Sequence, residues 1–210
     1  ARRAKLGRGA VTLMRDSAAQ VRREAAKAHV MAPPYVLKPV AEGSSFGVHI
    51  VREDHAHPPQ ELTAPDWAYG EELLAERYIA GRELTCAVID GQPTDVIEIL
   101  PVGLSFYNYE SKYAVGGSKH ILPADISPKI YTSVQELTLS AHKALGCRGV
   151  SRADFRWDDR RDGTGEVACL EVNTQPGMTG TSLVPELAAH RGMSFGDLVR
   201  WIVEDASLDR

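Results

Sequence analysis

Arg152-Ala-Asp154-Phe-Arg-Trp157 and, after a short polar turn, Val167-Ala-Cys-Leu-Glu171-Val-Asn173-Thr-Gln-Pro-Gly177 are the stretches that decide the fold. They predict two strands that carry a cation, two carboxylates and an amide. Side chains of a strand alternate between its faces, so Arg152 shares a face with Asp154, and Glu171 shares one with Asn173. Asp154, Glu171 and Asn173 offer hard oxygen ligands, the set that suits Mg²⁺ held jointly with substrate phosphates. We expect one face to present negative charge for metal and positive charge for phosphate.

A second interpretation of these carboxylates is that they are ordinary solvated residues at strand ends. The turn from Asp158 to Arg161 is likewise common hairpin chemistry. The combination favours a site, because Glu171 and Asn173 flank a single Val in an apolar strand and would be costly to bury without partners.

The composition is that of a soluble globular protein, with 210 residues, 43% of them apolar and 25% charged. No run approaches the roughly 20 apolar residues that a membrane-spanning helix needs, so we expect no membrane partner. Cys86, Cys147 and Cys169 have no C-x-x-C spacing. They are typical of small core residues in a reducing compartment, which predicts a cytoplasmic protein.

The N-terminal segment is strongly basic. Residues 1–28 carry a net charge of +6, so the rest of the chain carries −10. A basic arm can bind nucleic acid, but this one has neither an aromatic residue for base stacking nor a recognisable motif. Its Ala-rich part, Ala18 to Ala28, favours a solvated helix, and we expect no nucleic-acid partner.

The first half of the chain predicts a hairpin and a helical stretch. Tyr35 to Lys38 reads as a strand after an extended Pro-Pro entry, and Val48 to Val51 reads as its partner. Residues 53–66 are polar and Pro-rich, which indicates a loop. Glu71 to Tyr78 is rich in helix formers and favours a helix that ends before Gly81.

The second half predicts another hairpin, Leu84 to Ile89 with Val96 to Leu100, joined through Asp90-Gly91. Residues 101–124 indicate a long ordered loop. A helix ending at Gly146 is predicted by apolar residues on one helical face, namely Ile130, Val134, Leu137, Ala141 and Leu145.

Ser182 and Ser194 are expected to cap two further helices, and Asp197 after Ser194 comes close to a capping box. The last helix is expected to bury a stripe made of Phe195, Leu198, Ile202 and Val203. The whole pattern predicts an α+β fold in two lobes, residues 1–80 and residues 81–210.

Lys38 and the loop from Glu42 to Gly47 form a second group of interest. Glycines let backbone N–H groups point into a concavity that accepts anions, and Ser44 adds a hydroxyl donor. The loop matches neither a Walker loop nor the dinucleotide fingerprint. A simple glycine-rich hairpin turn explains it equally well.

Taken in order, five motifs resemble those of the D-alanine–D-alanine ligases, a family of the ATP-grasp superfamily, over about residues 27–208. They are Lys38-Pro-Val-Ala-Glu42-Gly43-Ser44-Ser45-Phe-Gly47, Glu76-Arg-Tyr78-Ile79-Ala-Gly81-Arg-Glu83-Leu-Thr, Lys112-Tyr113, Arg152-Ala-Asp154, and Glu171-Val-Asn173-Thr-Gln-Pro-Gly177-Met-Thr-Gly-Thr-Ser182-Leu183. The resemblance implies an ATP-grasp fold, in which two lobes of antiparallel or mixed sheets and helices clasp ATP between them.

The resemblance also implies an activity. ATP would phosphorylate the carboxylate of one D-alanine, and the amine of a second D-alanine would attack the acylphosphate to give a peptidoglycan precursor. It implies ATP with two Mg²⁺ ions, which Mn²⁺ can replace, and a cytoplasmic homodimer.

Site residues follow from the resemblance, motif by motif. Lys38 would contact the nucleotide phosphates, Glu76, Tyr78 and Ile79 the adenine, Glu83 the ribose, and Lys112 the γ-phosphate, while Tyr113 would meet Ser44 when the long loop closes. Arg152 would stabilise the transferred phosphoryl group, Asp154, Glu171 and Asn173 would hold Mg²⁺, Gly177 would help form the oxyanion site, and Ser182 and Leu183 would receive the carboxylate of the second D-alanine.

The chain departs from the family pattern in two ways. No part of it resembles the N-terminal domain that holds the first D-alanine, and only Lys5 could match an upstream ATP-binding lysine. The chain alone is therefore expected to bind nucleotide and to ligate poorly. Two alternatives stay open, a D-alanine–D-lactate ligase and a non-catalytic nucleotide-binding remnant.

Overall fold

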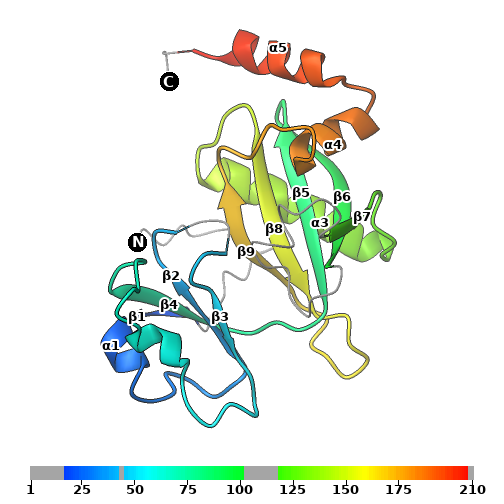
Figure 1. Ribbon diagram of the computed structural model, residues 1–210. Coiled ribbons are helices and arrows are strands. Elements are labelled where there is room, and N and C mark those ends of the chain that lie inside the picture. The colour runs from blue at the N-terminus through cyan, green and yellow to red at the C-terminus, as the bar shows by residue number, and fades with distance from the viewer. Residues whose placement is uncertain (1–16, 43–44, 102–117, 208–210) are drawn as a thin grey trace. The chain divides into compact units, whose positions relative to one another are not determined.

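The computed structural model describes residues 17–42, 45–101 and 118–207 (Figure 1). They fall into two compact units. One contains the described residues up to Ile79, and the other contains Ala80–Leu100 and the described residues from Lys119 onward. Both units are built on antiparallel strand pairs with helices beside them, which confirms the α+β class. Within the described ranges, no helix is long and apolar enough to span a membrane.

The first unit is a four-stranded sheet with the order β1-β4-β2-β3, in which all neighbours are antiparallel. The predicted hairpin is confirmed by the pairing of β2 with β3. The bounds are β1 Ser17–Val21, α1 Arg22–Ala25, β2 Tyr35–Pro39, β3 His49–Val51, the short 3₁₀ helix η1 Gln60–Thr63, and β4 Glu72–Arg77. The core of this unit consists of Ala25, Tyr35, Leu37, Val51, Leu62, Leu73 and Ala75.

Two helix predictions in this unit are wrong. Part of the segment from Ala18 to Ala28 forms β1, and α1 is only four residues long. The segment from Glu71 to Tyr78 contains β4, which pairs with β1 on one side and with β2 on the other. Leu73 and Ala75, two residues apart, are both fully buried, so the period is that of a strand. Pairing and burial outweigh the helix propensity of these residues.

The second unit is a five-stranded sheet with the order β7-β6-β5-β8-β9. The predicted hairpin is confirmed, since Asp90 and Gly91 both have the positive φ that a two-residue turn requires. The strand bounds are β5 Arg82–Ile89, β6 Gln92–Pro101, β7 Ser118–Ile121, β8 Ser151–Trp157 and β9 Val167–Asn173.

Helix α3, Pro128–Ala144, packs on one face of this sheet (Figure 1). The core between them contains Leu84, Cys86, Val96, Ala124, Val134, Ala153 and Phe155. The predicted helix is therefore confirmed, although Leu145 at its C-cap is 60% exposed. Because Ala153 and Phe155 face α3, strand alternation directs Arg152 and Asp154 to the opposite face.

Two shorter helices end the described chain, α4 Leu183–His190 and α5 Phe195–Asp205. The predicted cap of α5 is confirmed, because the Oγ of Ser194 accepts a hydrogen bond from the amide of Asp197 at 3.1 Å. The predicted buried stripe is largely wrong: Leu198 is fully buried, but Phe195 is 49% and Val203 67% exposed. The reason is the position of α5, which packs against α4 and extends away from the sheet (Figure 1).

The cysteines are all free thiols. Cys86 lies in the core as expected, whereas Cys147 and Cys169 are only partly buried, so the expectation of a core position is wrong for these two. Cys147 follows the C-terminal end of α3, and Cys169 lies on β9, at the edge of the sheet, where fewer side chains cover it.

Candidate metal and nucleotide site

Four predicted site residues face one another across β8 and β9. Asp154 is the direct antiparallel partner of Glu171, and Arg152 is the direct partner of Asn173. Directly opposed residues share a face of the sheet, with Cβ atoms about 4.5–5.5 Å apart. The two carboxylates, the guanidinium and the amide therefore form one patch on the face opposite α3.

A β-bulge in β9 creates this patch. Asp154 pairs with Glu171, but the next residue, Phe155, pairs with Cys169, which leaves Leu170 as an extra residue. Cys169 packs on the α3 side, and strict alternation would direct Glu171 to the same side. The extra residue instead turns Glu171 to the face of Asp154. Bulges beside functional sites commonly redirect a side chain in this way.

Asp154 is 93% buried and tightly held. Arg152 donates to it through Nε, 2.9 Å from Oδ1, and through Nη2, 2.7 Å from Oδ2. Thr85 donates its hydroxyl to Oδ1 at 2.6 Å, from the position directly opposite Asp154 on β5. Thr85 was not predicted as a site residue from the sequence. The feature that could have indicated it is a hydroxyl residue inside the apolar strand from Leu84 to Ile89.

The same face continues toward the start of β5. Glu83 is the direct partner of Arg156, and the guanidinium Nη1 of Arg156 lies 3.5 Å from Oε2 of Glu83. Arg156 was not predicted as a site residue from the sequence either. A charged residue at every second position of β8, namely Arg152, Asp154 and Arg156, was the pattern that could have indicated it.

The residues predicted to form the oxyanion site and to bind the second substrate lie together before and at the start of α4. Gly177 lies close to Ser182, because a Cβ added at Gly177 would be 3.0 Å from the Oγ of Ser182. Ser182 is the N-cap residue of α4, as predicted, although its side chain makes no hydrogen bond to the helix amides. Its Oγ instead accepts from the amide of Thr179 at 3.0 Å. Leu183 begins the helix and is buried.

The first turn of α4 is attached to the sheet through an acidic residue. Nδ1 of His120, on β7, lies 2.7 Å from Oε2 of Glu186. This contact holds a carboxylate of the helix in a defined place one turn after Ser182.

In the first unit, two predicted nucleotide residues are in direct contact. Nζ of Lys38 lies 2.7 Å from Oε2 of Glu76, which is nearly buried. Ile79 is buried, and the amide of Tyr78 donates to the carbonyl of Pro34 at 3.1 Å. The unit thus places a cation, a carboxylate and apolar surface on neighbouring strands and the segment that follows. Ser44, Lys112 and Tyr113 lie outside the described residues.

The oxygen ligands fit a hard cation that shares its coordination with a substrate. In the described part of the chain, no three His, Cys, Asp or Glu side chains gather closely enough to hold a metal alone. Asp154, Glu171 and Asn173 supply two carboxylates and one amide. Mg²⁺ is commonly bound by one or two carboxylates, with water and substrate phosphates completing its octahedron.

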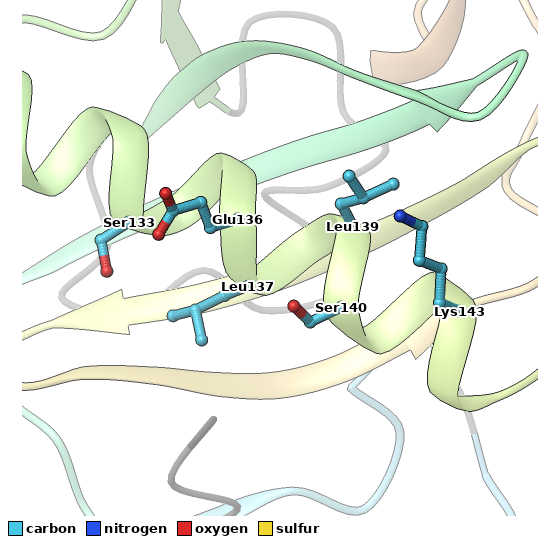
Figure 2. A pocket seen from close by; sticks show the side chains of 6 residues that line it. All are labelled: Ser133, Glu136, Leu137, Leu139, Ser140 and Lys143. Carbon is cyan, nitrogen blue, oxygen red and sulfur yellow. The ribbon is translucent and has the colours of Figure 1, made fainter. Parts of the chain in front are cut away.

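A hollow elsewhere on the second unit carries no comparable chemistry. Figure 2 shows that all six of its labelled lining residues come from the single helix α3. They are Ser133, Glu136, Leu137, Leu139, Ser140 and Lys143. Binding sites need polar groups that converge from several elements, so we assign the candidate site to the strand face instead.

Comparison with known proteins agrees with the geometry. A family model described as "D-ala D-ala ligase C-terminus" matches residues 9–204. The D-alanine–D-alanine ligase of Afipia carboxidovorans is 70% identical over 189 residues, which are 90% of this chain and 61% of that protein. The corresponding enzyme of Rhodopseudomonas palustris is 67% identical over 200 residues, which are 95% of this chain and 62% of that protein.

Two solved structures are also similar. The D-alanine–D-alanine ligase from Bacillus anthracis complexed with ATP has a TM-score of 0.68 and 27% identity, over 90% of this chain and 59% of that one. The VanG D-Ala:D-Ser ligase from Enterococcus faecalis has a TM-score of 0.70 and 30% identity, over 93% and 57%. The chain thus spans about three fifths of the length of the proteins that it matches.

Proposed function

Because this chain belongs to the D-alanine–D-alanine ligase family, we propose that its protein joins two molecules of D-alanine at the expense of ATP. ATP phosphorylates the carboxylate of the first D-alanine, which releases ADP. The amine of the second D-alanine attacks the acylphosphate, and phosphate leaves as the peptide bond forms. The product serves as a peptidoglycan precursor. The observation that carries this proposal is the patch in which Asp154 faces Glu171 and Arg152 faces Asn173.

Five described residues serve the nucleotide in this proposal: Lys38, Glu76, Tyr78, Ile79 and Glu83. Lys38 binds phosphate as a compact cation, and its ion pair with Glu76 keeps it in place before the nucleotide arrives. The buried Ile79 supplies apolar surface for adenine. The similar Bacillus anthracis enzyme was solved with ATP, which supports this assignment. We carry over Lys112, Ser44 and Tyr113 from the motifs alone.

Asp154, Glu171 and Asn173 would hold two Mg²⁺ ions, and Mn²⁺ would substitute for them. Bound there, the ions would neutralise charge on the ATP phosphates. Arg152 contributes a permanent positive charge on the same face, which would stabilise the phosphoryl group in transfer. The patch is chemically suited to both tasks because its acidic and basic groups lie side by side on two paired strands.

The second D-alanine would place its carboxylate at the N-terminal end of α4. Amides of the first helical turn have no partner within the helix, and the helix dipole favours an anion there. Since the side chain of Ser182 does not cap these amides, they can bind the carboxylate of the substrate. Leu183 contributes its backbone, and the segment at Gly177 supplies the oxyanion contact.

The state of the whole protein is part of the proposal. We expect a homodimer in the cytoplasm that works with D-alanine and ATP and without a nucleic-acid or membrane partner. Light scattering on the full-length protein tests the dimer, and a monomer at working concentration would contradict it.

Measurement of ADP release tests the activity. The full-length protein is assayed with D-alanine, D-lactate, D-serine or no acceptor, and the product is identified by mass. We expect D-alanyl-D-alanine as the main product. A faster reaction with D-lactate or D-serine would assign a different acceptor. A rate of ADP release that is the same with and without an acceptor would refute ligation.

Substitution of the metal ligands tests the site. We expect Asp154→Asn or Glu171→Gln to lower turnover by roughly 10²–10³, because a metal ion supplies several kcal/mol of charge stabilisation. The circular dichroism spectrum should stay unchanged. Glu136→Gln, on the exposed side of α3, is the matched control and should retain activity. Full activity of either ligand variant at ordinary Mg²⁺ would rule out the metal assignment.

A further inference from the structure

The carboxylate of Asp154 is held by more than one side chain. Arg152 binds it through Nε and Nη2. Because Arg152 is also proposed to act on the transferred phosphoryl group, a contact on Asp154 that is independent of Arg152 gains importance. A ligand carboxylate has to be held within narrow limits to bind metal well.

Thr85 makes a contact of that kind. Its side chain is fully buried, and its hydroxyl lies 2.6 Å from Oδ1 of Asp154 and 3.2 Å from the carbonyl of Ala153. A hydroxyl has one proton, and the shorter distance assigns it to the carboxylate. Hydrogen bonds to an ionised group are also the stronger ones.

The contact does not depend on the position of Arg152. Thr85 is placed by the antiparallel pairing of β5 with β8, which continues on both sides of it, from Arg82 to Val88. Its β-branched side chain has few rotamers available in a strand, so the hydroxyl is directed by the backbone itself. Arg152, in contrast, has a long side chain that can turn without any change in strand pairing.

We infer that Thr85 is a positioning residue, which holds Oδ1 of Asp154 in place independently of Arg152 and so orients the carboxylate for the cation. The inference rests on the proposed function. The residue acts through Asp154 and touches no substrate.

Mn²⁺ binding tests this role without turnover. Free Mn²⁺ is measured by electron paramagnetic resonance in the full-length protein with a non-hydrolysable ATP analogue. Thr85→Val keeps the shape and β-branching of the side chain and removes the hydroxyl. We expect its dissociation constant for Mn²⁺ to rise about 10–100-fold, the usual effect when a contact that orients a metal ligand is lost.

Two further variants separate positioning from packing. Thr85→Ser restores the hydroxyl and should restore most of the Mn²⁺ affinity. Thr138→Val is the matched control, because Thr138 is equally buried and donates to the carbonyl of Val134 within α3, at 2.8 Å. This control should bind Mn²⁺ like the unsubstituted protein.

The outcomes distinguish the inference from the proposed function. Equal Mn²⁺ affinity in the unsubstituted protein and in Thr85→Val overturns the role of Thr85 alone. Absence of Mn²⁺ binding in the unsubstituted protein overturns the proposed metal site and this inference with it. If the valine variant does not fold, the serine variant decides, since a folded Thr85→Ser with affinity lowered about 10-fold or more would refute positioning by the hydroxyl.

Discussion

Replacement of Arg82 by methionine should destabilise the second unit strongly. Arg82 binds Glu98 through two hydrogen bonds, one of them 2.6 Å long from Nε to Oε1, and donates to the carbonyl of Asp125 at 2.9 Å. Its guanidinium also lies over the ring of Trp157, 5.5 Å from the centroid. The bonds to Glu98 raise the pKa of Arg82, so the guanidinium stays charged. Glu98 is buried, and methionine would leave its carboxylate without this partner.

The size of the effect follows from this burial. Removal of one partner of a buried ion pair costs about 3–5 kcal/mol. The side chain of Arg82 is 24% exposed, so we take the lower end, about 3 kcal/mol. For a chain of 210 residues, 1 kcal/mol corresponds to about 2–4 °C, and the melting temperature should therefore fall by roughly 6–12 °C.

A double-mutant cycle tests whether the destabilisation arises because Glu98 loses Arg82 as its partner. Urea unfolding followed by circular dichroism is measured for Arg82→Met, for Glu98→Met and for the double variant. The double variant should recover to within about 1 kcal/mol of the parent, because removal of both charges leaves no carboxylate to compensate. Arg200→Met is the control, since the ion pair of Arg200 with Asp197 is exposed and worth about 0–1 kcal/mol.

The explanation by an unpaired carboxylate would be refuted in two ways. One is a loss below about 1 kcal/mol in Arg82→Met, the level expected of a surface pair. The other is a double variant as unstable as the sum of the two single variants.

Three further predictions concern backbone, pH and thiols. Gly81→Ala should lower the free energy of unfolding by at least about 2 kcal/mol, measured by thermal unfolding, because φ is +105° and the new Cβ would lie 2.1 Å from the last carbonyl of β8. Gly165→Ala is the control, since its φ is positive but its Cβ meets no atom within 4 Å, and it should lower the free energy of unfolding by less. Equal losses in the two variants would refute the clash. Hydrogen bonds from Arg160 hold the pKa of Asp158 well below its usual value, so its stabilisation is complete above about pH 4 and is lost as pH falls below that. The urea midpoint should therefore drop more between pH 6 and pH 3 in the parent than in Asp158→Asn, and parallel curves would contradict this. Burial raises the pKa of the Cys86 thiol, so it should react slowly with iodoacetamide at pH 7, and turnover should survive alkylation; inactivation without unfolding would contradict a structural role.

Local sequence patterns predicted the elements whose signals lie within a few residues. The turn at Asp90-Gly91 and the cap at Ser194 are of this kind, and both are confirmed. Local patterns gave wrong predictions where residues distant in the sequence determine the secondary structure or the burial of a segment. The helix formers of β4 became a strand because β1 and β2 pair with it on both sides. Phe195 and Val203 repeat with a helical period, but their burial depends on what packs beside α5.

The candidate site likewise has features that the sequence predicts and features that only the tertiary structure determines. The sequence alone determined the ligand types, hard oxygens for metal and a permanent cation for phosphate, and it determined that Arg152 shares a face with Asp154. Only the tertiary structure decided that Glu171 joins that face. Alternation along one strand is a local property, whereas the bulge at Leu170 arises from the register between β8 and β9. Thr85 could be placed opposite Asp154 only by the pairing of β5 with β8, because residues 69 positions apart share no local geometry.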